Sequence, residues 1–310
     1  MLSRRHLRIK VMQSLYSFYQ APSTDLLLAE KQLFSGIDKI YDLYLYLLLL
    51  PVELADWSRR AGFIEKHFPT REDQLVTRLS ESQFILQIME NPAFNKVIKD
   101  RKISWKGQED MLEKMFLEIK KTNLFKNYIL NESRSFELDK AFVVELFNKI
   151  LAPSADLQGF IEERNIFWNN SEQWMSTVAV KSLQGIKEGS QDDFLAPLYR
   201  EESDKSFVRE LFMQTVIYGP DYEKSISEKT KNWEVERIAM MDVILMKMAL
   251  AELVHFTQIP VKVTINEYLE IAKDYSTPKS NAFINGIIDK LSSEYKASGK
   301  IKKQGAGLVE

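Results

Sequence analysis

The first ten residues carry the densest group of side chains that could bind a charged ligand. Arg4, Arg5 and Arg8 all precede the first acidic residue, Asp25. Arg5 and Arg8 would be neighbours on a helix, because residues three apart share a face. Cations at a helix start oppose the helix dipole, at a cost of roughly 0.3 kcal/mol or more each. Their repetition therefore favours a functional use over a solvated helix start, and the chemistry that they suit is phosphate binding.

A second candidate lies near the other end of the chain, in the segment KSNAFINGIIDK. Phe283 stands one residue off an apolar stripe and close to Lys279, Ser280 and Asn281, so we expect its ring on the rim of a buried helix face. An aromatic ring at such a rim can stack on an unpaired nucleic-acid base. An ordinary core residue at the edge of the packing explains the same pattern equally well.

Residue types exclude most catalytic and metal-binding chemistries. The chain has no cysteine, which removes disulfides, thiolate nucleophiles, zinc ribbons and iron–sulfur clusters. Its three histidines, His6, His67 and His255, are far apart in sequence, which argues against a catalytic triad or a histidine-rich metal site. No glycine-rich phosphate loop follows a predicted strand. We therefore expect no catalytic site, no cofactor and no metal.

Charge and hydropathy place further limits on the function. The 42 Lys and Arg residues nearly balance the 44 Asp and Glu residues, so any binding of nucleic acid must come from a local patch. The most apolar run, Leu43 to Val52, is far shorter than the ~20 residues that a membrane-spanning helix needs. We expect a cytoplasmic protein with no targeting segment and no contact with a membrane.

Helices must position these candidates. Eleven glycines and nine prolines among 310 residues are few, and apolar residues recur at helical spacing, so we predict an all-α fold. Ser3 is expected to cap a first helix that ends at Gln20 and has an apolar stripe. Further helices are expected over residues 25–51, 74–89, 108–130, 138–151, 171–186, 203–219, 234–256, 261–275 and 276–297.

Four segments of the chain, taken in order, resemble the NusB family of transcription antitermination factors. The opening RRHLRIKVMQSLYSF matches the start of that family. The later segments WEVERIAMMDVILMKMALAEL, IPVKVTINEYLEIAKDY and KSNAFINGIIDKL match its C-terminal motifs. Each segment alone is a weak signal, and their order makes the resemblance specific.

The resemblance implies an all-helical protein without enzymatic activity. Such a protein would bind boxA-type single-stranded RNA in ribosomal-RNA leader transcripts, together with the small-subunit ribosomal protein NusE. The pair would join an antitermination complex on RNA polymerase. Carried over by position, the implied RNA-binding residues are Arg4, Arg5, Arg8, Lys279, Ser280, Asn281 and Phe283, and the implied interface with NusE contains Tyr16 and Asp242.

The resemblance also divides the chain. Residues 1–21 would form the first helix of the bundle with its basic motif, and residues 201–297 its C-terminal helices. Residues 22–200 add to the length of an ordinary family member and are expected to be a helical insertion. Residues 298–310 are expected to be a flexible tail. Gly286 is expected to allow a close helix approach.

Two other classes of protein share parts of this pattern. Ribosomal-RNA cytosine methyltransferases carry a NusB-like domain, but their nucleophilic cysteine is absent here. The remaining alternative is a protein–protein interaction scaffold whose RNA binding is vestigial.

Overall fold

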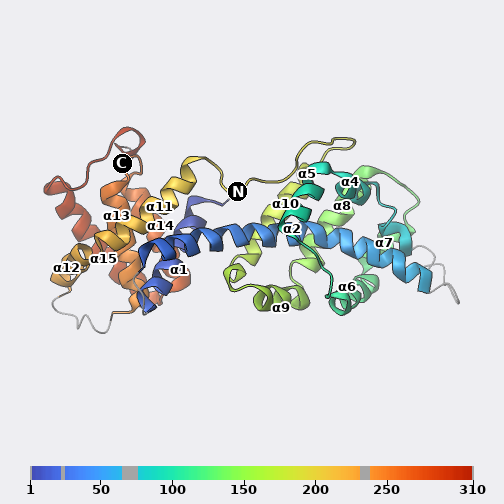
Figure 1. Cartoon of the computed structure of the whole chain (residues 1–310), viewed down its shortest axis with the longest axis horizontal. Coiled ribbons are helices and arrows are strands. Elements are labelled where there is room, and N and C mark those ends of the chain that lie inside the picture. The colour runs from blue at the N-terminus through green and yellow to red at the C-terminus, as the bar shows by residue number, and fades with distance from the viewer. Residues whose placement is uncertain (1, 22–24, 65–75, 231–237, 309–310) are drawn as a thin grey trace. The chain divides into compact units, whose positions relative to one another are not determined.

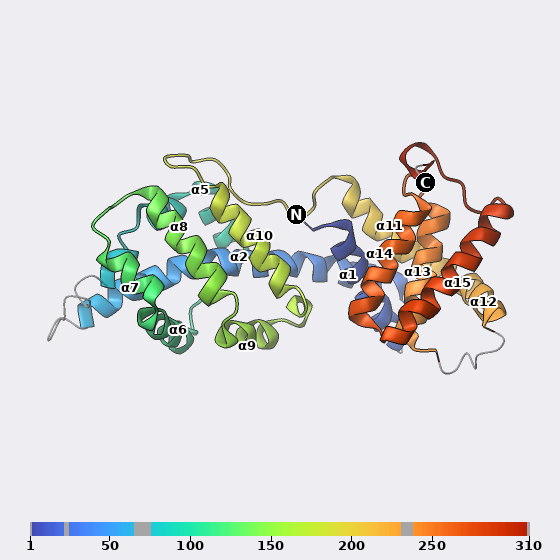
Figure 2. The same ribbon diagram turned by 180° about the vertical axis from the view of Figure 1, so that it is seen from behind.

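The computed structural model of the chain describes residues 2–21, 25–64, 76–230 and 238–308. Within these ranges every regular element is a helix (Figures 1 and 2). The only β-type pairing in the described ranges is one isolated parallel bridge between Leu2 and Tyr199. The prediction of an all-helical fold is confirmed. No helix in the described part of the chain combines the length and the apolar content needed to cross a bilayer.

The chain separates into two compact units. Unit 1 contains Met1–Gly36 and Leu198–Glu310, and unit 2 contains Ile37–Pro197. The long helix α2 (Leu26–Ile64) contributes its first turns to unit 1 and the remainder to unit 2. Unit 2 lies within residues 22–200, where the insertion is expected, and the bounds of that insertion stay a prediction.

Unit 1 is a helical bundle built around α13 (Met240–His255). This helix is mostly apolar, is buried over most of its length and packs against α1, α11, α12, α14 and α15, as expected for a helix without a solvent face. Residues 234–237, expected as its first turn, lie outside the described residues. The other helices of the bundle are α1 (Arg4–Gln20), α11 (Ser203–Ile217), α12 (Gly219–Lys229), α14 (Val261–Tyr275), α15 (Pro278–Ala297) and the short η6 (Gly305–Leu308).

The start of α2 belongs to this bundle through specific contacts. Glu30 forms an ion pair of 2.5 Å with Arg209 of α11, and the Arg209 guanidinium lies 5.3 Å from the centre of the Phe34 ring. These contacts explain why the first turns of α2, up to Gly36, belong to unit 1.

Unit 2 has a core of its own, rich in aromatic rings. The centre of the Tyr46 ring, on α2, lies 5.2 Å from the ring centre of Trp105, 5.6 Å from that of Phe160 and 5.4 Å from that of Trp168. The two indole N–H groups donate to main-chain oxygens of α2, so both indoles are core residues. The remaining elements of unit 2 are η2 (Val76–Leu79), α4 (Gln83–Glu90), α5 (Pro92–Arg101), α6 (Glu109–Lys121), α7 (Asn123–Leu130), α8 (Phe136–Leu146), the π-helical η3 (Phe147–Leu151), α9 (Ala155–Arg164), η4 (Ile166–Trp168) and α10 (Glu172–Gly185).

Several helix boundaries differ from those predicted. The helix expected to end at Pro51 continues to Ile64, because apolar packing on both sides of Pro51 outweighs the lost main-chain hydrogen bond. The helices expected over 74–89 and 108–130 are each divided, since Ser82 and Thr122 accept main-chain N–H groups as N-caps of new helices. The helices α5 and α9 were not predicted.

The C-terminal tail, expected to be flexible, makes specific contacts. Ile301 is buried, Lys303 Nζ donates to Phe256 O at 2.9 Å, and the Gln304 N–H donates to Thr257 O at 3.0 Å. A Cβ atom added to Gly307 would lie 2.0 Å from the same Thr257 oxygen, so only glycine fits there. The tail is thus packed on the turn between α13 and α14.

Candidate nucleic-acid interface

The start of α1 is held by a reciprocal cap. Ser3 Oγ accepts the main-chain N–H of His6 at 3.4 Å, and His6 Nδ1 accepts the main-chain N–H of Ser3 at 3.3 Å. Burial lowers the pKa of His6, and together with the charges of Arg200 and Arg5 it brings this pKa to about 4. The imidazole is therefore neutral at neutral pH, as an accepting Nδ1 requires. This cap fixes the direction in which the first turn presents its arginines.

Arg4 lies against the start of α11. Its Nε donates to Asp204 at 3.2 Å, and its guanidinium lies 5.2 Å from the centre of the Phe207 ring. Its side chain is 39% exposed, so the cation remains accessible although it is paired.

Arg5 is paired with Glu267 of α14 in a bidentate arrangement. Its Nε and Nη2 donate to the two carboxylate oxygens at 3.0 and 2.7 Å, and 43% of its side chain is exposed. Burial would raise the pKa of Glu267, but the hydrogen bond from Arg5 and the charges of Arg8 and Arg5 outweigh it and lower that pKa. Both groups are charged at neutral pH, and the pair faces solvent.

Arg8 occupies a different environment from Arg4 and Arg5. Its side chain is 3% exposed, and its Nε and Nη2 donate to the two oxygens of the fully buried Glu252, each at 2.7 Å. Thr264 and Tyr268 donate to the same carboxylate at 2.8 and 3.1 Å, and Arg8 Nη1 reaches Glu267 at 3.4 Å. Burial alone would lower the pKa of Arg8, but the Glu252 charge outweighs it and raises it. This network joins α1 to α13 and α14.

The burial of Arg8 corrects one expectation drawn from the sequence. The sequence predicts Arg5 and Arg8 as neighbours on one face of the first helix, with a chemistry that suits phosphate binding. In the structure only Arg5 is accessible, and removal of Arg8 would leave Glu252 buried without its counter-ion. A role of Arg8 in RNA contact stays a prediction.

A hollow of about 690 Å³ opens beside the cap of α1. Arg4, Arg5 and His6 line one side, and the turn that contains Gln258 and Pro260 lines another. Arg200, in the segment before α11, completes the cationic side, while Glu267 contributes the negative charge. Such a hollow suits an anionic ligand that approaches from solvent.

The second predicted cluster, on α15, does not line this hollow within the described part of the chain. Lys279 is exposed and Phe283 is half-buried. Ser280 and Asn281 serve the local structure, since Ser280 lies at the cap formed by Thr277 and Asn281 Nδ2 donates to Leu269 O at 2.8 Å. Gly286 is exposed, and a Cβ atom there would meet no atom within 4 Å, so the expected close helix approach at Gly286 is wrong.

The two residues predicted at the interface with NusE differ in exposure. Tyr16 on α1 is 40% exposed, which leaves its ring available to a partner. Asp242 in the first turn of α13 is 4% exposed and accepts a hydrogen bond from Ser276 Oγ. Its negative charge also lies at the favourable end of the α13 dipole. The interface stays a prediction for both residues.

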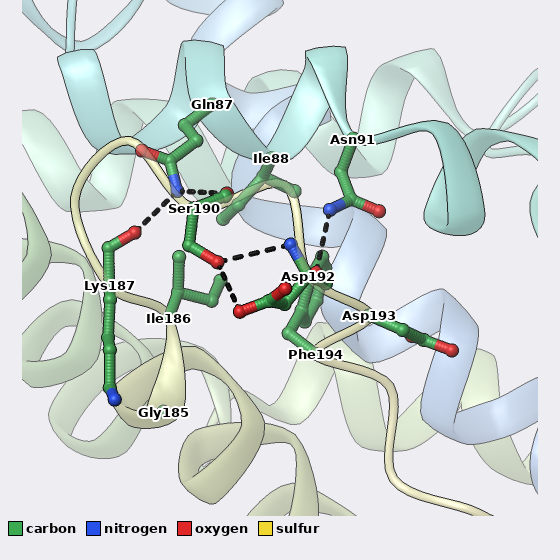
Figure 3. A pocket seen from close by; sticks show the side chains of 10 residues that line it. All are labelled: Gln87, Ile88, Asn91, Gly185, Ile186, Lys187, Ser190, Asp192, Asp193 and Phe194. Carbon is green, nitrogen blue, oxygen red and sulfur yellow. Dashed lines mark hydrogen bonds between the residues drawn. The ribbon is translucent and has the colours of Figure 1, made fainter.

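Unit 2 contains a smaller hollow of about 230 Å³, whose walls are held by internal contacts (Figure 3). Gln87 Nε2 donates to the main-chain oxygens of Lys187 and Ser190, and Asn91 Nδ2 donates to that of Asp192. These amides fix the segment after α10 against α4 and α5. None of the predicted site residues lies in unit 2, which begins at Ile37 and ends at Pro197.

Sequence reasoning missed Glu252, Glu267, Gln258 and Arg200 as parts of the site. Glu252 and Glu267 lie inside the segments that resemble the family. Arg8 lies next to the apolar stripe of the first helix, and a buried arginine needs a carboxylate partner, which was a signal for such a residue. Arg200 had no such signal, because its place depends on the pairing of the segment before α11 with Leu2.

The fold and the site define a class: an all-helical protein with a cationic hollow at the capped start of its first helix. The NusB family model matches residues 175–293. The chain belongs to the NusB family. The match begins inside α10, so residues 175–200, expected to belong to the insertion, lie within the part shared with the family.

Relatives support this membership. The "Transcription antitermination protein NusB" of Salinibacter ruber is 39% identical over 113 residues, which is 36% of this chain and 71% of that protein. Proteins of the same name from Chloroherpeton thalassium and Geotalea uraniireducens are each 41% identical, over 106 and 88 residues. The matched parts span 34% and 28% of this chain, and 50% and 61% of those relatives. No solved structure matches the chain.

Proposed function

We propose that this protein is a transcription antitermination factor that binds boxA-type single-stranded RNA in ribosomal-RNA leader transcripts. It would act together with the small-subunit ribosomal protein NusE, within an antitermination complex on RNA polymerase, by binding and not by catalysis. The names of its relatives support antitermination. The cationic hollow beside α1 is the observation that supports RNA as the ligand.

The proposed interface combines two kinds of contact. Arg4 and Arg5 would bind phosphates, because their guanidinium groups are partly exposed at the hollow. Lys279 and the half-buried ring of Phe283 would provide a further cation and a stacking surface on α15. Tyr16 would contribute an exposed ring to the contact with NusE.

The salt dependence of RNA binding tests this proposal. Each phosphate contact to a single strand contributes about 0.7 to the slope of log affinity against log salt concentration. The double variant Arg4→Gln, Arg5→Gln should therefore flatten the slope by roughly 1.4. Phe283→Ala should lower the affinity by about 1–3 kcal/mol with little change in slope, because stacking releases no counterions.

The measurement is fluorescence anisotropy of a labelled boxA-like oligonucleotide across a potassium chloride series, with a scrambled oligonucleotide as control. If the parent protein does not distinguish the two oligonucleotides, or if the double arginine variant keeps the parent slope, the RNA-binding proposal fails. The interaction scaffold with vestigial RNA binding would then be favoured. One observation already supports that alternative, since Arg4, Arg5 and Arg8 are each paired with a carboxylate.

A further inference from the structure

The cations that line the hollow beside α1 differ in whether a phosphate could reach them without displacing a carboxylate. Arg4 is paired with Asp204, Arg5 with Glu267 and Arg8 with Glu252. The side chain of Arg200 is exposed, and among the described residues it forms no ion pair or hydrogen bond. An incoming anion would therefore meet an available positive charge first at Arg200.

The main chain at Arg200 is fixed although its side chain is unpaired. The Leu2 N–H donates to Leu198 O at 3.2 Å, and Leu2 forms a parallel bridge with Tyr199. The Arg200 N–H donates to Asp204 at 3.2 Å, and Asp204 also binds Arg4. Arg200 is thus held by its backbone at the edge of the same hollow as Arg4, and only the rotamers of its side chain need to be ordered on binding.

The charge of Arg200 acts inside the hollow. After burial, it is the largest influence that lowers the pKa of His6, which lines the same hollow. A positive potential that reaches His6 also reaches a phosphate placed between the two residues.

We propose that Arg200 contacts a phosphodiester group of the RNA strand and is a binding residue of this hollow in addition to Arg4 and Arg5. The inference rests on the proposed RNA-binding function and extends it to a segment outside the arginine motif of α1. Because no carboxylate must leave Arg200, its contact costs less than those of Arg4 and Arg5. A bidentate guanidinium–phosphate contact also orients the strand at that point.

The test compares three variants of the full chain. Arg200→Gln removes the charge in the hollow, and Arg200→Lys keeps it without the planar fork. Lys224→Gln is the matched control, because Lys224 is an exposed cation on α12 that does not line the hollow. The side chain of Arg200 has no partner among the described residues, so all three variants should keep the thermal unfolding midpoint of the parent.

Anisotropy of the labelled boxA-like oligonucleotide across the potassium chloride series gives the readout. Arg200→Gln should reduce the salt slope by about 0.7 and weaken binding at low salt about tenfold. Arg200→Lys should keep the slope, and Lys224→Gln should match the parent in both. If the parent binds RNA and Arg200→Gln matches Lys224→Gln, the role of Arg200 is overturned and the RNA-binding function stands. If the parent binds no RNA, both fail.

Discussion

Glu267 accepts hydrogen bonds from two arginines that differ in their exposure to solvent. Arg5 reaches it from the open side of the hollow, and Arg8 reaches it from the buried network around Glu252. A phosphate bound at Arg5 must compete with this carboxylate, and the negative charge also repels the strand. Glu267 should therefore lower the affinity of the proposed site for RNA.

We expect Glu267→Gln to strengthen RNA binding. The amide keeps an acceptor for Arg5 but removes the competing charge, which should raise the affinity by about 1 kcal/mol for a partly exposed group. Glu270→Gln is the control, since Glu270 is paired with Lys273 and does not line the hollow. Oligonucleotide titrations of both variants check this expectation, and a weaker or unchanged affinity for Glu267→Gln would contradict it.

Arg8 is expected to matter for stability far more than Arg5 does. Arg8→Ala leaves a buried carboxylate without its counter-ion, which should lower the free energy of unfolding by about 3–5 kcal/mol. Arg5→Ala removes an exposed pair and should cost at most about 1 kcal/mol. Urea unfolding of the two variants measures the difference.

A double-variant cycle assigns the cost of Arg8→Ala to Glu252. If Glu252→Gln is added to Arg8→Ala, the uncompensated charge disappears and part of the lost stability should return. A cycle without coupling between the two positions would show that the loss arises from packing and not from the ion pair.

At the scale of the element, the N-terminal cap of α1 depends on His6, a side chain that titrates. His6 accepts the Ser3 N–H only while its imidazole is uncharged, and its pKa is lowered to about 4 by burial and by nearby cations. Between pH 6.5 and about 4 the unfolded chain therefore binds a proton that the folded chain does not. Stability must then fall as the pH decreases through this window.

Replacement of His6 by glutamine should weaken that pH dependence. Glutamine at this position also accepts the N-cap N–H, so the reciprocal cap is kept without a titrating group. Thermal unfolding of the parent and of His6→Gln from pH 7 to pH 4 checks the expectation through the difference between the two curves. Parallel curves would show that other groups cause the acid sensitivity.

The same helix shows how far sequence reasoning reaches. Ser3 as N-cap and the Leu7–Leu15 stripe follow from local rules, and the structure confirms both. The different environments of Arg5 and Arg8 could not be read from α1 alone. They depend on Glu252 and Glu267, more than 240 residues away in sequence. Local rules place a side chain on a face, whereas its partner is set by the packing of other helices.

At the scale of the whole molecule, the sequence predicted additional helices but not the bounds of the second unit. Gly36 and Ile37 lie inside one uninterrupted helix, so neither composition nor a turn marks the change from unit 1 to unit 2. The aromatic core around Tyr46 also joins α2 to Trp105 in the loop after α5, to α9 and to η4, which are distant in sequence. Boundaries of this kind depend on long-range contacts that periodicity does not encode.

Two separate cores predict unfolding that is not two-state. Tyr46→Ala should destabilise unit 2 by about 3–5 kcal/mol, the range for a large aromatic residue in a core. In calorimetry this variant should shift one transition and leave another in place. Its RNA affinity, measured below both transitions, should equal that of the parent. A single transition, or a loss of RNA affinity in the folded variant, would show that the two units are energetically coupled.

The packed C-terminal tail has a consequence for the chemical reactivity of the protein. Burial lowers the pKa of Lys303 to about 8, against the opposing charge of Glu252. At pH 7 the Lys303 amine is then uncharged and nucleophilic in roughly a tenth of the molecules, about 300 times the fraction for an ordinary lysine. An acylating reagent at limiting concentration should therefore mark Lys303 early, which peptide mass spectrometry would detect. Acylation would also replace the ammonium group that donates to Phe256 O with a larger neutral amide, which should weaken the packing of the tail on the turn at Thr257.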